Sequence, residues 1–448
     1  MLGSLKARSS RFDPRRHERG ISLLLVAISI FALFGVAALL IDVVTLYVAK
    51  ADAQRVANAA ALAGAKALVD GGVTADPTNA STEWGEACLL ATAEAQKIVS
   101  TNTIGGVAAT LPSGNVCFGS HVILPCASAC PTSGSAGSGF GVNPQIGVTL
   151  QSASLPLFFA KILGKATATV SAGGVAEGFN SSGTTVPVAS RGVMPWLIPN
   201  IDPQNGGTII DTTGTATDGR MVLPGPTGFI GEKITLNMGC AVSGCATLTA
   251  PNFVAGPPTT SSTFYPISLA NPSSMGPACS TAATNYQKNL VASNPTSVAC
   301  GATATLDTTV APTTAANEIE LECRIGATGP GLNQDQDTID PAFPFRMEAG
   351  DNNPLVANGS VNKADVISTS QSVVTIPVYN AGASGGPYLA PATPVIIGFV
   401  QAFVVSTSGG NPTVQILNVS GCGATARGAS PAVGSDGASA VPVRLIHP

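Results

Sequence analysis

Three aspartates in the string NQDQDTID are the residues of this chain whose type and spacing could bind a metal ion. They are Asp335, Asp337 and Asp340, and further carboxylates follow at Glu348 and Asp351. Calcium takes several oxygen ligands of this kind, but an EF-hand loop also requires a central glycine and a closing glutamate that this spacing lacks. A solvated acidic loop is therefore the first interpretation, and a weak calcium site at the three aspartates is the alternative.

A serine nucleophile is the second chemistry to test, because GASGG at residues 382–386 formally fits the pattern Gly-x-Ser-x-Gly. In a hydrolase this serine stands directly before a helix, whereas the Gly-Gly-Pro that follows here favours a further turn. A nucleophile also needs a base, and outside the N-terminal segment the chain has only His121 and His447. We therefore predict that the protein is not an enzyme and needs no cofactor.

Ten cysteines in a chain with only 10% charged residues indicate disulfide bonds and an oxidising compartment. Zinc is the alternative, but it requires CxxC pairs or histidine partners, and the spacings here are looser. Cys240 and Cys245 are close enough to form a small local loop, whereas the full connectivity cannot be derived from spacing. The candidates are Cys88, Cys117, Cys126, Cys130, Cys240, Cys245, Cys279, Cys300, Cys323 and Cys422.

The charge is distributed unevenly along the chain. Residues 1–20 contain six basic and two acidic residues, a net charge of +4, so with −4 overall the remaining residues carry −8. Binding to nucleic acid requires clustered lysine and arginine on the binding domain. The acidic main part of the chain argues against this, and we predict no nucleic-acid partner.

The elements that position these residues begin with an uncharged run of 21 residues, Ile21–Ile41. As a helix it is long enough to cross a hydrocarbon core of about 30 Å. Three arginines precede it and Asp42 follows it, and basic flanks stay in the cytoplasm. We therefore expect a single-pass protein in a lipid bilayer, with residues 1–20 inside. A cleaved signal peptide is the alternative, although its apolar region is normally about 7–15 residues long.

Residues 42–68 are rich in alanine, the strongest helix former. We therefore expect the membrane helix to continue outward as a stalk to Leu68. One row of alanines recurs every four residues, and small residues at this spacing let another backbone approach closely. The row packs either on the protein's own ectodomain or against other subunits and membrane partners. Its members are Ala49, Ala53, Ala57, Ala61 and Ala65.

A basic segment ending in Arg-Gly, the apolar span, an aspartate, an aromatic residue, a glutamine and the block NAAALAGA follow one another in the first 65 residues. This order resembles the TadE/TadG-like family of the bacterial Tad (Flp, tight-adherence) pilus systems. The family usually has aspartate where the block begins, and asparagine in its place removes a charge. The corresponding residues are Gly20, Asp42, Tyr47, Gln54 and Asn58.

A second stretch, residues 148–177, is similar to the family in its strand, its aromatic-rich turn ending in Leu-Gly and its following valine-rich strand. The resemblance implies a protein of the bacterial inner membrane with a periplasmic or cell-surface ectodomain. Such a protein acts in pilus assembly, anchoring or adhesion, and its partners are other pilus-assembly or envelope proteins.

Two alternative functions remain open at this point. The first is a minor pilin in the fibre. Related pilins are cut after a glycine and carry glutamate five residues later, whereas this chain has Leu25 five residues after Gly20. The second is a surface adhesin or structural envelope protein unrelated to pili.

The residue patterns predict an α+β fold: one long N-terminal transmembrane helix that continues as a stalk, then a β-rich, disulfide-containing ectodomain. In a first unit, 69–188, they predict a helix over 80–99 and strands over 145–154 and 166–172. A helical turn between these two strands should close at Gly164.

A second unit, 189–448, begins after a turn-rich joint and contains short apolar or alternating runs typical of strands, such as KITLNMGCAV, VVTIPVYNAG, VIIGFVQAFVVS and TVQILNVSGCG. The many prolines favour loops and strand edges over helices. Only 282–290 is expected to be helical beyond two turns, and the low-complexity end is expected to be loosely ordered.

Overall fold

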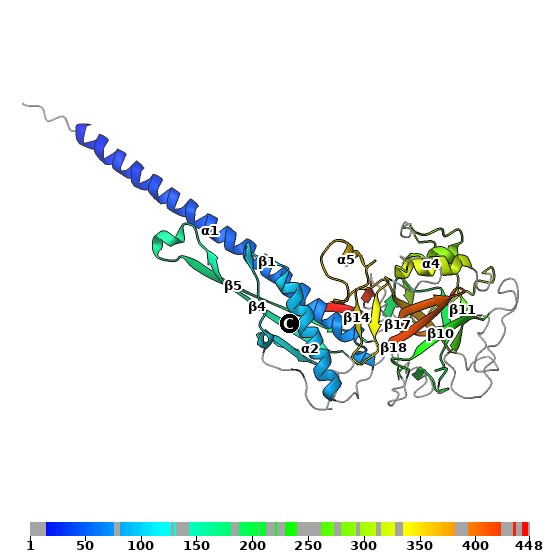
Figure 1. Cartoon of the computed structure of the whole chain (residues 1–448). Coiled ribbons are helices and arrows are strands. Elements are labelled where there is room, and N and C mark those ends of the chain that lie inside the picture. Colours follow the sequence, from blue (N-terminus) through cyan, green and yellow to red (C-terminus); the bar gives the residue numbers. More distant parts are fainter. Residues whose placement is uncertain are drawn as a thin grey trace, which may run out of the picture.

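The structure is a computed structural model of the 448-residue chain. Figure 1 shows one long helix that runs out of a mixed α+β ectodomain at one end. The residues described are 15–75, 81–126, 130, 143–180, 188–204, 206–211, 220–221, 229–239, 261–272, 279–292, 296–310, 315–327, 335–380, 393–422, 433–435 and 441–446.

Helix α1 spans Arg15–Asp70 and is continuous through the predicted membrane segment and the predicted stalk. At 1.5 Å per residue it is roughly 84 Å long. It ends at two glycines: the Gly71 amide donates to the Ala67 carbonyl at 3.0 Å, and Gly72 has a φ of +79°, a left-handed conformation that favours glycine. The predicted long helix is confirmed.

The second half of α1 packs on helix α2 and on one face of an antiparallel sheet. Helix α2 spans Ser81–Ser100, close to its predicted position. Strands β4 (Gln145–Pro156) and β5 (Thr167–Gly178) form a long hairpin around the helical turn η3 (Ala160–Leu163). As predicted, this turn closes at Gly164, whose φ is +83°.

The last strand of the chain belongs to this first sheet, whose order is β20–β5–β4–β3. Strand β3 is Val116–Gly119, and β20, Val443–Ile446, runs antiparallel to β5. Arg444 of β20 forms an ion pair with Glu177 of β5. Most of the predicted loosely ordered stretch, residues 423–443, lies outside the described residues, and β20 begins at its last residue.

Six strands of the second unit close into a barrel in the order β10–β11–β7–β16–β17–β18. Strand β10 is parallel to β11 and β16 is parallel to β7, whereas the other described pairs are antiparallel. Buried side chains such as Trp196, Phe264 and Ile376 fill its core. Four of these strands, β10, β16, β17 and β18, were predicted. The bounds are β7 Trp196–Pro199, β10 Lys233–Met238, β11 Ser261–Pro266, β16 Val373–Tyr379, β17 Ile396–Ser408 and β18 Asn411–Gly421.

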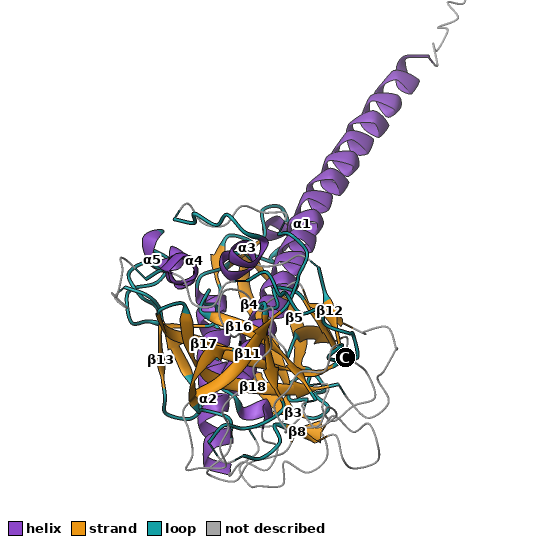
Figure 2. Cartoon of the chain, turned by 90° about the vertical axis from the view of Figure 1, so that its right-hand side faces the viewer, coloured by secondary structure: helices purple, strands orange, loops and turns teal. Residues whose placement is uncertain are grey.

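Short elements surround these two cores, and Figure 2 shows how α1 projects away from the strands. In the first unit they are η1 Val73–Ala75, β1 Thr103–Ile104, β2 Val107–Ala108 and η2 Ser113–Asn115. In the second unit they are β6 Val188–Ser190, β8 Ile210–Asp211, β9 Arg220–Met221, β12 Val298–Ala299, β13 Thr338–Asp340, β14 Arg346–Glu348, α5 Pro354–Ala357, β15 Val366–Ile367 and β19 Val433–Ser435.

Helix α4 (Ala315–Ile325) is a three-turn helix that the sequence patterns did not predict. The helix predicted over 282–290 is present as α3, Asn285–Val291. The buried side of α4 mixes the apolar Leu321 and Ile325 with charged side chains, which makes its helical pattern hard to recognise in the sequence. Its Glu320 is 1% exposed and accepts hydrogen bonds from the Ser280 hydroxyl at 2.5 Å and the Thr281 amide at 2.7 Å. These bonds make the burial of the carboxylate possible.

Disulfide bonds join eight of the ten cysteines, which confirms the predicted disulfide chemistry for these residues. The Cα atoms of each pair lie 5.2–6.0 Å apart, a usual separation for bonded cysteines. Two of these disulfides cross-link the first unit and two cross-link the second. The predicted loop between Cys240 and Cys245 lies outside the described residues. The pairs are Cys88–Cys130, Cys117–Cys126, Cys279–Cys323 and Cys300–Cys422.

Polar bonds attach the last turn of α1 to the barrel. Asp70 is 5% exposed, forms an ion pair with Lys66 at 2.7 Å and accepts a hydrogen bond from the Gln401 amide of β17 at 3.1 Å. Burial raises the pKa of Asp70, and Lys66 and Gln401 partly oppose that rise. Beside this contact, the Asn418 side-chain amide of β18 donates to the Val69 carbonyl at 3.2 Å. The helix end is thereby fixed to both barrel strands.

We expect Asp70→Ala to loosen this joint, because it leaves buried partners without their acceptor. The loss in the free energy of unfolding should be about 1–3 kcal/mol, measured by urea denaturation of the full chain in detergent. The control is Asp351→Ala, which removes the carboxylate of an exposed pair with Lys363 and should cost less than about 0.5 kcal/mol. Equal stability of Asp70→Ala and the control would contradict this assignment.

Candidate functional site

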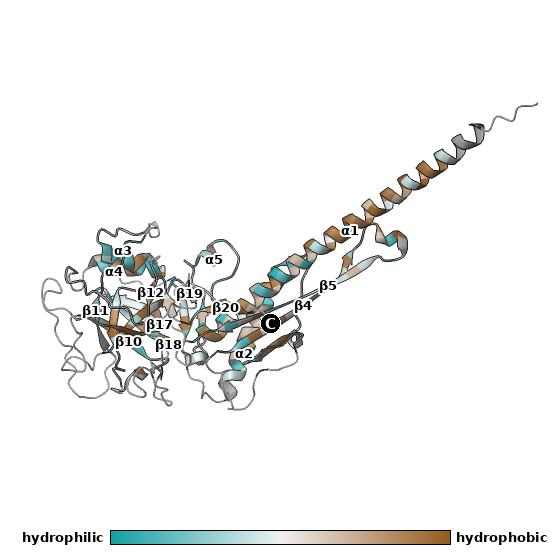
Figure 3. Cartoon of the chain, turned by 180° about the vertical axis from the view of Figure 1, so that it is seen from behind, coloured by the Kyte–Doolittle hydropathy of each residue, from teal (hydrophilic) through white to brown (hydrophobic). Residues whose placement is uncertain are grey.

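The outer half of α1 exposes a continuous apolar surface. By length and composition it is the one described helix that could cross a membrane, with a mean hydropathy of 2.9 in a window of which none is buried. Figure 3 shows this projecting part coloured as hydrophobic. Phe31 is 78% exposed and Phe34 is 69% exposed. Side chains this large and apolar on one continuous surface require a partner other than water, and a bilayer fits a helix of this length.

Asp42 joins the outer half of α1 to the hairpin. Although it is carried on the helix surface, it is only 2% exposed. Its carboxylate accepts hydrogen bonds from the backbone amides of Phe158 at 2.9 Å, Phe159 at 3.0 Å and Ala160 at 2.6 Å. These donors lie at the start of the turn η3, where backbone amides have no partner within the turn itself. We call this contact the Asp42 clasp.

The glutamine and asparagine of the predicted family pattern form a second contact with the hairpin. The Gln54 side-chain amide donates to the Asn58 side-chain oxygen at 2.9 Å and to the Gly173 carbonyl of β5 at 2.6 Å. Asn58 therefore acts here through an acceptor oxygen, which an aspartate would also provide, and this bond needs no negative charge. Tyr47 is 77% exposed, and Gly20 lies within the helix.

The alanine row is buried inside the protein's own first unit. Each of its five members is at most 2% exposed. Glycines let the sheet and α2 approach: a Cβ atom at Gly174 would lie 2.8 Å from the Ala57 carbonyl oxygen, and a Cβ atom at Gly64 would lie 3.1 Å from the Ala91 carbonyl oxygen. Of the two predicted alternatives, the structure shows the packing of the row on the protein's own ectodomain. An interface with other subunits through this row is not available in this conformation.

The three aspartates have different surroundings in the structure. Asp337 is 6% exposed, and its carboxylate accepts bonds from the Gly350 amide at 2.9 Å and the Ser370 hydroxyl at 2.6 Å. Asp340 accepts from the Ala342 amide at 2.9 Å, and Asp335 has a φ of +72° at a turn. Within the described residues, no group of three or more His, Cys, Asp or Glu side chains is arranged to hold a metal ion. The buried position of Asp337 differs from the solvated-loop interpretation, whereas Asp335 and Asp340 are half-buried.

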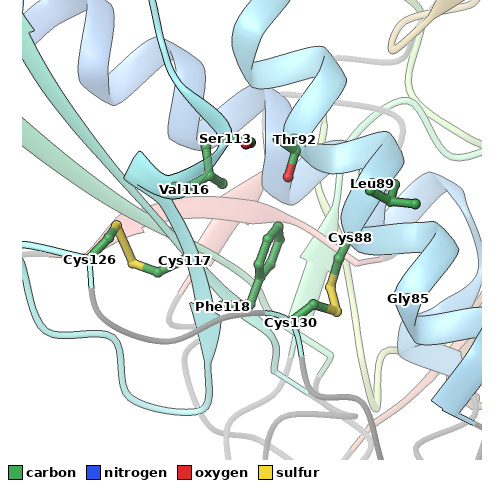
Figure 4. A pocket seen from close by; sticks show the side chains of 11 residues that line it. Gly85, Cys88, Leu89, Thr92, Ser113, Val116, Cys117, Phe118, Cys126 and Cys130 are labelled. Atoms are coloured by element: carbon green, nitrogen blue, oxygen red, sulfur yellow. A yellow bond between two sulfur atoms is a disulfide. The ribbon is translucent and has the colours of Figure 1, made fainter.

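A cavity of about 440 Å³ lies between α2 and β3. Figure 4 shows the ring of Phe118 between the disulfides Cys117–Cys126 and Cys88–Cys130, with Leu89 and Thr92 on α2. The residues that line it carry no ionisable group outside these disulfides, so the cavity can hold an apolar segment but supplies no acid or base. The GASGG string at 382–386 lies outside the described residues.

The Asp42 clasp is the contact that sequence reasoning missed. The aspartate, the aromatic-rich turn and its closing glycine were each recognised, but they lie more than 110 residues apart. Sequence spacing carries no signal that joins an acidic side chain to backbone amides at such a distance. The one sequence signal for this contact was that the aspartate and the aromatic turn both belong to the family pattern.

Residues 20–67 match a family described as putative Flp pilus-assembly TadE/G-like. The resemblance found in the sequence is thereby confirmed for the span and the stalk, including the residues of the clasp and of the Gln54 contact on α1. The hairpin lies outside the matched segment. No curated protein and no solved structure matches the chain.

We expect Asp42→Ala to free the tip of the hairpin without unfolding the ectodomain. Trypsin should then cleave the full chain in detergent after Lys161 and Lys165 several-fold faster, as measured by mass spectrometry of the fragments. The matched control is Asp52→Ala, because Asp52 pairs only across an exposed surface with Arg55 and such pairs contribute little. Unchanged cleavage in Asp42→Ala would show that the clasp does not hold the tip.

We also expect Ala57→Leu to destabilise the ectodomain by about 1–3 kcal/mol, because Ala57 is completely buried and the added carbons would overpack the core. The measurement is urea denaturation of the full chain in detergent. Ala59 is exposed on the same helix, so Ala59→Leu is the matched control and should change stability by less than about 0.5 kcal/mol. If Ala57→Leu unfolded like the wild type but lost crosslinks to other proteins, the row would be a partner interface instead.

Proposed function

We propose that this chain, whose residues 20–67 form a TadE/G-like Flp pilus-assembly domain, is a membrane-anchored component that acts in assembling or anchoring a bacterial Tad pilus. The observation that carries the proposal is the position of the match. It covers the apolar span and the stalk, and its Asp42 and Gln54 make the contacts that attach the ectodomain to this helix. Other proteins of the Tad system are the partners that this role requires.

The orientation that we propose places residues 1–20 in the cytoplasm, α1 across the inner membrane and the ectodomain in the periplasm or at the cell surface. The basic head and the apolar run Ile21–Ile41 support the direction of insertion. Four disulfides in the described ectodomain support an oxidising compartment on the far side.

An anchored component explains the packing of α1 better than a fibre subunit does. Subunits whose helices pack against each other use small residues to bring the backbones together, and here the row of small residues faces the protein's own sheet. Leu25 also replaces the glutamate that related pilins carry at the fifth position after the cut. The role that we propose is mechanical rather than catalytic.

The test is to remove the gene and to follow the pili and the protein. We expect cells without it to lose surface pili, and cells with a restored copy to regain them. After shearing, the protein should stay in the membrane fraction with an N-terminus that is not cut after Gly20, as shown by mass spectrometry.

Two results of this experiment would contradict the proposal. Recovery of the protein in sheared fibres, with Ile21 as its first residue, would make it a minor pilin. Normal piliation without the gene would make it an envelope protein unrelated to pili.

A further inference from the structure

The tip of the β4–β5 hairpin exposes large apolar side chains that the first unit does not need for its core. Phe158 is 64% exposed, Phe159 is 38% exposed and Ile162 is 83% exposed. Figure 1 shows the hairpin running alongside α1, with its tip at the level where the helix leaves the ectodomain. A turn of this kind normally carries polar residues, so three exposed apolar side chains in five residues indicate a surface that is covered in use.

The Asp42 clasp fixes the height of this tip relative to the membrane span. Asp42 is the first residue after the apolar run Ile21–Ile41, and it binds the backbone of Phe158 and Phe159 directly. A helical run of 21 residues covers about 30 Å, the thickness of the hydrocarbon core, so its outer end lies at the headgroup layer. The tip is therefore held at that layer.

The exposed apolar surface of α1 continues to the same level. Val43 is 53% exposed, Val44 is 58% exposed and Val48 is 53% exposed, whereas Asp42 faces the hairpin. Tyr47, at 77% exposed, stands in the same stretch, and tyrosine is enriched where a membrane meets water. The apolar side chains of the tip thus extend a surface of α1 that already faces lipid.

The charge of the tip suits a phospholipid surface. Residues 156–167 contain two basic residues, Lys161 and Lys165, and no acidic one. Both lysines are exposed, and lysines beside apolar side chains at an interface can reach lipid phosphates while their stems stay in the apolar layer.

We propose that the hairpin tip is a second membrane contact of this protein. Phe158 and Ile162 enter the headgroup layer of the bilayer that α1 crosses, and Lys161 and Lys165 bind anionic headgroups. The proposal rests on α1 being a membrane span, as proposed above. Two contacts in the same bilayer define the tilt of α1 and its rotation about its own axis, which a single span leaves open. The ectodomain is then presented to its partners in one orientation.

The test adds one tryptophan at a time to the full chain. Each variant is reconstituted in vesicles of phosphatidylcholine and phosphatidylglycerol whose brominated acyl chains quench tryptophan fluorescence on contact. The native Trp84 and Trp196 are buried and give the background. Phe158→Trp probes the tip and Phe34→Trp probes the span. Leu89→Trp is the matched control: Leu89 is 72% exposed on α2, near the contact of Ala91 with Gly64, roughly 33 Å beyond Asp42 along α1.

We expect quenching at positions 34 and 158 to be several-fold greater than at position 89. Quenching at 34 but not at 158 would overturn the tip contact and leave the anchor intact. No quenching at 34 would overturn the anchor and the tip contact together. Reversal of both tip charges, Lys161→Glu with Lys165→Glu, should reduce quenching at 158 in the anionic vesicles and not in pure phosphatidylcholine. If the charge reversal left quenching at 158 unchanged in the anionic vesicles as well as in pure phosphatidylcholine, the headgroup contact would be overturned.

Discussion

The close approach of α1 to the hairpin is the constraint on which the rest of the structure depends. The alanine face of the helix and the glycine at position 174 of β5 bring two backbones so near that a single added carbon would collide. Because the same helix continues into the apolar span, the core of the first unit and the membrane segment are parts of one rod. No linker separates the anchor from the folded domain, so the ectodomain cannot turn independently of the span.

Alanines bury little apolar area each, so this interface depends on specific polar bonds as well as on dispersion contacts. These bonds lie at three levels of α1. The Asp42 clasp holds the tip of the hairpin, Gln54 binds the middle of β5, and Asp70 binds the barrel at the end of the helix. Each level joins a helix side chain to a different part of the ectodomain, and the rod is thereby fixed along its whole packed half.

The features that sequence reasoning recovered are local in the chain. The uninterrupted helix, the hairpin with its closing Gly164 and four of the barrel strands each follow from residue patterns within a few turns or strands. The features that it missed depend on distant partners. Strand β20 completes a sheet that begins more than 300 residues earlier, and the Asp42 clasp joins a side chain to backbone amides that have no residue-specific signature.

Helix α4 was missed for a different reason. Its buried side combines Leu321 and Ile325 of the barrel core with Glu320, whose carboxylate is held by hydrogen bonds, and this mixture of apolar and charged residues hid the helix in the sequence. The alanine row shows the limit of spacing arguments in another way. Its small residues correctly indicated a close backbone contact, but the same pattern fits a partner in the chain and a partner outside it equally well.

The first unit and the barrel are attached to α1 in different ways. The alanine row of α1 shares one hydrophobic core with α2 and the sheet, so the helix is an integral part of the first unit. The barrel is bonded to the last turn of α1, at Lys66, Val69 and Asp70, and its core is separate from that of the first unit. Because the two cores are separate, we expect surface changes on the barrel to leave the packing of α1 on the first unit unaltered.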